Sequence, residues 1–167
     1  MTAGKLTLRD RAGESSLEAA PRPSRLRRQP VDPGPFVYRV VANVAKGGAA
    51  RARGTGWSIA LEAGQEDAAG LPGPADILAT ALAACLSKNV ERFSRILGFD
   101  YREATVSVEF ERQSSPPVMM RASYLVLVDS DEPEHRLALL HHNIRKYGTV
   151  TNTLAAAVEL QGDLRRL

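Results

Sequence analysis

The sequence of 167 residues contains a single cysteine, Cys85. One thiol excludes an internal disulfide, a multi-cysteine metal site and a self-contained dithiol redox cycle. Aromatic residues are scarce at 5%, and no apolar run approaches the roughly 18 to 20 residues that a membrane helix needs. The first residues also lack the long apolar segment of a secretory signal. We therefore expect no membrane partner and a location in the cytoplasm, where thiols stay reduced.

The positive charge of the chain is concentrated near its start. Residues 1–30 hold seven basic and three acidic residues, whereas the whole chain has a net charge of +3. The rest of the chain is therefore slightly acidic. Because residues 1–30 contain no aromatic side chain that could stack on bases, the pattern argues against nucleic-acid binding.

Residues 1–35 are predicted to be an extended, basic arm rich in proline and arginine. Five prolines between residues 21 and 35 block a continuous helix or strand. A mitochondrial transit peptide is the alternative, and the acidic residues Asp10, Glu14 and Glu18 argue against it.

Residues 36–167 are predicted to form one α+β domain with mainly antiparallel strands. Hydrophobic residues make up 44% of the chain, which is enough for one core. The expected elements in chain order are strands at 36–44 and 50–59, a helix at 74–97, strands at 101–112 and 118–128, a helix at 133–147 and a strand at 156–160. Pro74 favours a helix start, and Gly98 favours its end.

The helix at 74–97 carries an apolar stripe at helical spacing. Its expected members are Leu78, Ala81, Leu82, Cys85, Phe93, Ile96 and Leu97. The start of this helix is so apolar that a single domain of this size has too few other elements to cover it on all sides. The pattern therefore predicts that a second copy helps to bury the helix, in an intimate homodimer.

Two interpretations of Cys85 stay open from its neighbours alone. Leu78, Ala81 and Leu82 precede it at helical spacing, and a dry environment of this kind suppresses the ionisation of a thiol. Free cysteine is also among the most buried residue types, so a core residue is one interpretation. Lys88 follows one turn later and would activate the thiol if its ammonium group reached the sulfur. The other interpretation of Cys85 is therefore a reactive nucleophile.

Other chemistry-bearing residues give weaker signals. Among the three histidines, His141 and His142 are adjacent and His135 is isolated, so the spacing of a metal site is missing. His141 is either a proton acceptor or a hydrogen-bonded core histidine. The run 56–60 has the glycine and serine of a nucleophile elbow, but no helix follows it at once. No nucleotide-binding loop is present, so we expect no cofactor and no metal.

Two segments resemble those of one known family. The run from Pro74 to Leu86, with Cys85 near its end, is similar to the reactive-cysteine helix of the OsmC/Ohr family, the osmotically inducible and organic-hydroperoxide-resistance proteins. Residues 146–154 resemble the second cysteine segment of that family. The resemblance covers about residues 36–162. It implies an intertwined homodimer in which antiparallel sheets pack around long central helices.

The resemblance also implies an activity and site residues. Active members of this family reduce organic hydroperoxides with one attacking cysteine and a second cysteine that closes a disulfide. Cys85 matches the attacking residue, and Gly148 stands where the second cysteine would be. Ala75 replaces a glutamate of the hydroperoxide-resistance branch. Arg51 stands two residues late for the family's arginine and is, with Lys88, a candidate partner of the thiolate.

Two functions follow from this comparison. The first is a thiol peroxidase of oxidative stress defence that uses Cys85 alone, so that an external thiol must reduce the oxidised cysteine. The second is a non-catalytic homodimer of the same fold that binds a small apolar molecule or has lost its activity.

Overall fold

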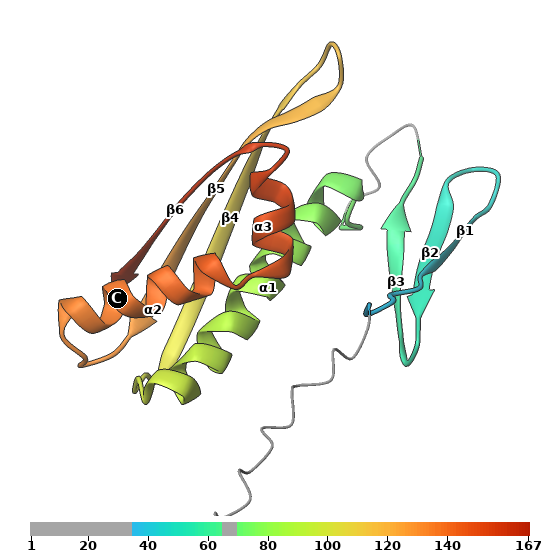
Figure 1. Ribbon diagram of the computed structural model, residues 1–167. Helices are drawn as coiled ribbons and strands as arrows, with labels where there is room; N and C mark the ends of the chain where they lie inside the picture. Colours follow the sequence, from blue (N-terminus) through green and yellow to red (C-terminus); the bar gives the residue numbers. More distant parts are fainter. Residues whose placement is uncertain (1–34, 65–69) are drawn as a thin grey trace, which may run out of the picture. The chain divides into compact units, whose positions relative to one another are not determined.

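The structure is a computed structural model that describes residues 35–64 and 70–167. The predicted arm at 1–35 therefore lies outside the described residues except for its last one. Residues from Tyr38 to Leu167 belong to one compact unit. Its elements in chain order are β1 (Val41–Val44), β2 (Ala49–Gly54), β3 (Trp57–Glu62), α1 (Pro74–Leu97), β4 (Glu103–Gln113), β5 (Val118–Asp129), α2 (Glu134–Lys146), α3 (Thr149–Ala155) and β6 (Glu159–Arg166). They make a mixed α+β fold with two small sheets (Figure 1).

The first sheet is an antiparallel meander in the order β1-β2-β3. Its first turn uses Gly47 and Gly48, whose positive φ angles of 97° and 90° suit glycine. The strand predicted at 50–59 is in fact two strands. A second turn at Thr55 and Gly56, with φ 79° at the glycine, reverses the chain between them. The expected strand at 36–44 is also shorter, since only its last four residues pair.

The second sheet has the order β4-β5-β6. β4 and β5 form a long antiparallel hairpin, whereas β6 runs parallel to β5 because α2 and α3 carry the chain back across the sheet. The last strand begins at Glu159 rather than at residue 156, because residues 156–158 form a turn after the α3 helix, which was not predicted. The strand predicted at 101–112 corresponds to β4, where apolar and polar residues alternate along the sequence: Val106, Val108 and Phe110 pack against the core, and the residues between them are exposed.

Helix α1 begins and ends at the predicted residues. Pro74 occupies the first turn, and the carboxylate of Asp76 accepts a hydrogen bond from the backbone N–H of Gly73 at 2.9 Å. At the other end Gly98 adopts the left-handed conformation, with φ 59°.

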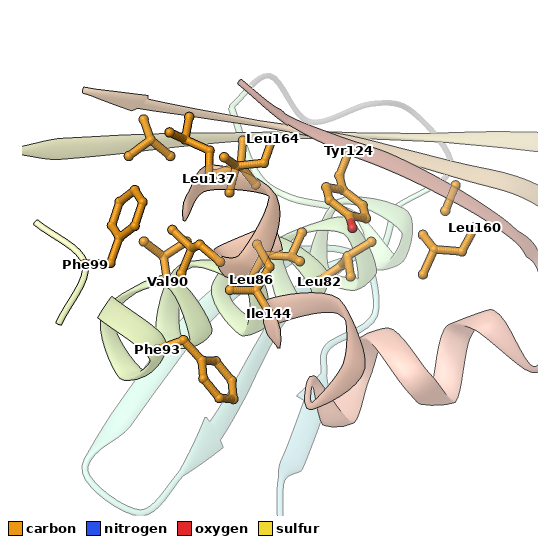
Figure 2. Packing of buried hydrophobic residues seen from close by; sticks show 14 of the residues in the cluster. Leu82, Leu86, Val90, Phe93, Phe99, Tyr124, Leu137, Ile144, Leu160 and Leu164 are labelled. Carbon is orange, nitrogen blue, oxygen red and sulfur yellow. The ribbon is translucent and has the colours of Figure 1, made fainter. Parts of the chain in front are cut away.

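One hydrophobic core joins α1 and α2 to the second sheet (Figure 2). From α1 it takes Leu82, Leu86 and Val90, which are at most 1% exposed. The buried line of α1 is thus rotated from the predicted stripe. Ile96 is 61% exposed, and Cys85 lies at the edge of the buried face. Leu137, Leu140 and Ile144, which stand at helical spacing in the sequence, form the buried side of α2. Among the described helices, none has the length and hydropathy of a membrane-crossing segment.

Candidate active site around the Cys85 thiol

Cys85 is a free, partly exposed thiol on α1 with two polar neighbours. The Nδ2 atom of Asn89 and the Oγ1 atom of Thr151 each lie 4.0 Å from its Sγ atom. Both neighbours are buried, with exposed fractions of 6% for Asn89 and 1% for Thr151. The sulfur therefore lies against polar groups on its inner side while part of the cysteine stays exposed.

Local structure explains why these side chains meet. Asn89 follows Cys85 by four residues, which places both on the same side of α1. Its amide also donates a hydrogen bond of 3.3 Å to the backbone carbonyl of Ile144 near the end of α2. Thr151 comes from the first turn of α3. The site is thus assembled where the end of α2 and the start of α3 pack against the middle of α1.

Gly148, which precedes α3, lies directly beside this group. A Cβ atom at residue 148 would be 2.5 Å from Thr151 Oγ1 and 3.1 Å from Asn89 Nδ2. The φ angle of Gly148 is −82°, which any residue adopts, so its lack of a side chain is required by space and not by backbone conformation. The structure therefore brings both Cys85 and Gly148 next to the same two polar side chains.

The two candidate cationic partners have other positions. Arg51 lies on β2, and its Nη1 atom donates a hydrogen bond of 3.2 Å to the hydroxyl of Ser58 on the neighbouring strand. Lys88 is exposed on α1, one turn after Cys85. Within residues 35–64 and 70–167, the polar contacts of the thiol are with uncharged groups only.

His141 forms a hydrogen-bonded pair elsewhere on the core. Its Nε2 atom lies 3.0 Å from the hydroxyl oxygen of Tyr124 on β5. Burial lowers the pKa of His141, and burial likewise raises the pKa of Tyr124. The histidine is therefore a partly buried, hydrogen-bonded residue beside the core. In the described part of the chain, no group of three or more metal-ligating side chains is close enough to hold an ion.

An apolar hollow lies beside the first half of α1. It has a volume of about 550 Å³ and is lined by residues of β2, β3 and α1, among them Trp57, Ile59 and Ile77. Glu62 contributes the one charged side chain of its lining. The Oε1 atom of Glu62 is buried and has no hydrogen-bond partner among the described residues. The hollow can thus accept an apolar group with one polar atom near this carboxylate.

Comparisons with known proteins agree with this architecture. The family model of OsmC-like proteins matches residues 64–161. No curated protein sequence matches the chain. Solved structures with a similar fold include an OsmC-like protein from Mycoplasma pneumoniae, with a TM-score of 0.74 and 17% identity over 79% of this chain and 98% of that chain. Another is the organic hydroperoxide resistance protein OhrB of Bacillus subtilis, with a TM-score of 0.59 and 14% identity over 78% of this chain and 98% of that chain.

Proposed function

The chain belongs to the family of OsmC-like proteins, and on this basis we propose that it is a one-cysteine, thiol-dependent reductase of organic hydroperoxides in oxidative stress defence. The observation that supports this most is the partly exposed Cys85 thiol, which lies 4.0 Å from each of two buried polar side chains, on a helix within the segment that matches the family. Some structures with the same fold are named organic hydroperoxide resistance proteins, at 14% and 12% identity.

The proposed reaction has two stages. The Cys85 thiolate attacks the terminal oxygen of the hydroperoxide, so that an S–O bond forms, the O–O bond breaks and the departing alkoxide takes a proton from water. An external thiol then attacks the sulfenic acid sulfur, which releases water and forms a mixed disulfide. A second external thiol frees Cys85 and carries the disulfide away. Gly148 has no sulfur, so the reductant must come from outside the chain.

The proposed assembly is a homodimer in the cytoplasm, with α1 at its centre. Every residue of β1 is exposed, including Val41 and Val44 at 59% and 68%. Trp57 on β3 is 50% exposed. Apolar surface of this kind marks an interface, and a second copy is the partner that supplies a matching surface. In that assembly Arg51 and Lys88 are the cations proposed to approach the thiolate.

A non-catalytic homodimer that binds a small apolar molecule is the second candidate. The hollow of about 550 Å³ favours it, because its lining is almost wholly apolar. The uncharged neighbours of Cys85 favour it too, since cations beside a thiol are the usual means of activation.

Consumption of an organic hydroperoxide separates the two candidates. The full chain is mixed with cumene hydroperoxide and an excess of a small thiol, and loss of the peroxide is followed over time. The reductase proposal expects turnover that Cys85→Ser abolishes. Equal rates for the wild type and Cys85→Ser would leave the binding protein as the remaining candidate.

A further inference from the structure

We infer that Thr151 and Asn89 are positioning residues that set the reactivity of the Cys85 thiol through uncharged hydrogen bonds. The inference deepens the proposed reductase and rests on it for its biological purpose. It assigns roles to two residues that no sequence motif identified. The physical basis is the geometry of these two side chains around one sulfur atom.

The hydroxyl of Thr151 has the sulfur as its partner. Thr151 is 1% exposed, and among the described residues the one polar contact of its side chain is with Cys85 Sγ at 4.0 Å. A buried hydroxyl that cannot reach water turns its proton toward whatever acceptor is present. Here the neighbouring atom is the sulfur. Either group can donate while Cys85 is a thiol, but with the thiolate the hydroxyl donates and the sulfur accepts, in a stronger, charge-assisted bond.

Asn89 supplies the second donor and keeps it in place. A side-chain amide carries two N–H groups on the same nitrogen. The Nδ2 atom of Asn89 is 3.3 Å from the carbonyl oxygen of Ile144 and 4.0 Å from the sulfur. The carbonyl thus fixes the direction of the amide, and the other N–H is free to face Cys85. Because Asn89 is 6% exposed, water competes little for this bond.

Gly148 provides the space that this arrangement needs. A Cβ atom there would lie 2.5 Å from the oxygen of Thr151, so any side chain at residue 148 would displace the hydroxyl from its place. The hydroxyl of Thr151, which faces the sulfur, therefore fills the space that a side chain at residue 148 would need. Residue 148 is the position that matches the second cysteine of the family. The absence of a side chain at residue 148 and the contact of Thr151 with the sulfur therefore belong to one packing arrangement.

The role in the reaction is electrostatic and transfers no atoms. During attack on a hydroperoxide, negative charge leaves the sulfur for the peroxide oxygens, while the S–O bond forms and the alkoxide takes its proton from water. Donors that are already oriented stabilise the thiolate before attack without further reorganisation. Thr151 and Asn89 would thus raise the fraction of Cys85 that is ready to react.

The test compares two variants that differ in the hydroxyl. Thr151→Val keeps the shape of the side chain and removes the donor, whereas Thr151→Ser keeps the donor and removes a methyl group. The rate at which iodoacetamide alkylates the native protein at neutral pH reports thiol reactivity without any peroxide. We expect about a tenfold slower reaction for Thr151→Val, the effect of one hydrogen bond to a charged group, and a rate close to wild type for Thr151→Ser.

Two outcomes would overturn the inference. One is a wild-type alkylation rate for Thr151→Val, which would show that the hydroxyl does not act on the sulfur. The other is an equal decrease in alkylation rate for Thr151→Val and Thr151→Ser, which would indicate that Thr151 affects the thiol through packing alone. A protein that shows the expected alkylation rates but consumes no hydroperoxide would refute the reductase proposal and leave the role of Thr151 intact.

Discussion

A Cβ atom at residue 148 would lie 2.5 Å from the hydroxyl oxygen of Thr151, and the same oxygen lies 4.0 Å from the sulfur of Cys85. The smallest residue type at one position thus allows a polar side chain to reach the thiol from another. The helix start at α3, which holds both Gly148 and Thr151, is therefore part of the site. Changes to its packing should be measurable both in stability and in the reactivity of Cys85.

Gly148→Ala should destabilise the fold by about 1–3 kcal/mol, because the added methyl group overlaps with a buried side chain. Urea denaturation of the wild type and the variant gives the difference. Gly73→Ala is a matched control, since Gly73 also precedes a helix, has a φ of −81° and would place its Cβ no closer than 3.6 Å to another group. Equal decreases in the free energy of unfolding for Gly148→Ala and Gly73→Ala would contradict the packing described around Thr151.

Gly162→Ala tests a second close contact, between β6 and the ring of Tyr124. A Cβ atom at residue 162 would lie 2.1 Å from two ring carbons, so the ring must move or the strands must separate. We expect a loss of stability at least as large as that for Gly148→Ala. In the double variant with Tyr124→Ala, the added methyl group should cost much less, because the obstacle is gone. If the losses of stability from Gly162→Ala and Tyr124→Ala were strictly additive in the double variant, the ring would not occupy this space.

His141 should make the stability depend on pH below neutrality. Burial lowers its pKa in the folded state, with Asp163 raising it and Arg145 lowering it to smaller extents. The unfolded chain therefore takes up a proton on this ring before the folded protein does. Its stabilising contribution is complete above the unfolded pKa of about 6.5 and is lost as the pH falls through the folded pKa.

The measurement compares urea denaturation of the wild type and His141→Gln between about pH 7.5 and about pH 5.5. The wild type should lose more stability over this interval than the variant, which lacks the titrating ring. Carboxylates titrate in both proteins and so cancel in the comparison. Parallel curves would mean that the histidine is not shielded from water by its contact with Tyr124.

Local sequence patterns were sufficient to predict the parts of the fold that depend on neighbouring residues. The alternation of β4 and the ends of α1 at Pro74 and Gly98 follow from periodicity and from helix-end preferences. The split between β2 and β3 was missed, because Thr55 and Gly56 make a short turn inside a β-rich run. Helix α3 was missed as well, since its residues include several β-branched ones, which favour strands in isolation.

Only part of the candidate site could be predicted from the sequence. Cys85 was identified from its helix, and Asn89 stands at a spacing that places it on the same side of α1. Thr151 is 66 residues away from Cys85, so only the packing of α3 against α1 brings the two together. Spacing along a chain carries no information on such a contact. The position of Arg51 relative to the thiol is likewise not given by spacing along the chain; its observed partner is the hydroxyl of Ser58.

Charged substitutions on β1 should dissociate the proposed homodimer. In Val41→Lys combined with Val44→Lys, two exposed apolar side chains become cationic, and burying them would be costly. Light scattering after size-exclusion chromatography should give the mass of two chains for the wild type and of one chain for the variant. Val118→Lys, at a 45% exposed position at the start of β5, serves as the control and should remain dimeric. A wild-type protein with the mass of one chain would refute the assembly.

Intact-protein mass spectrometry after brief exposure to organic hydroperoxide tests the central claim most directly. We predict that the full chain gains one oxygen atom at Cys85 and that an added small thiol converts this product into a mixed disulfide, while Cys85→Ser stays unchanged. An unmodified wild-type protein, or a Cys85→Ser variant that gains oxygen to the same extent, would contradict the account of Cys85 as the reacting group.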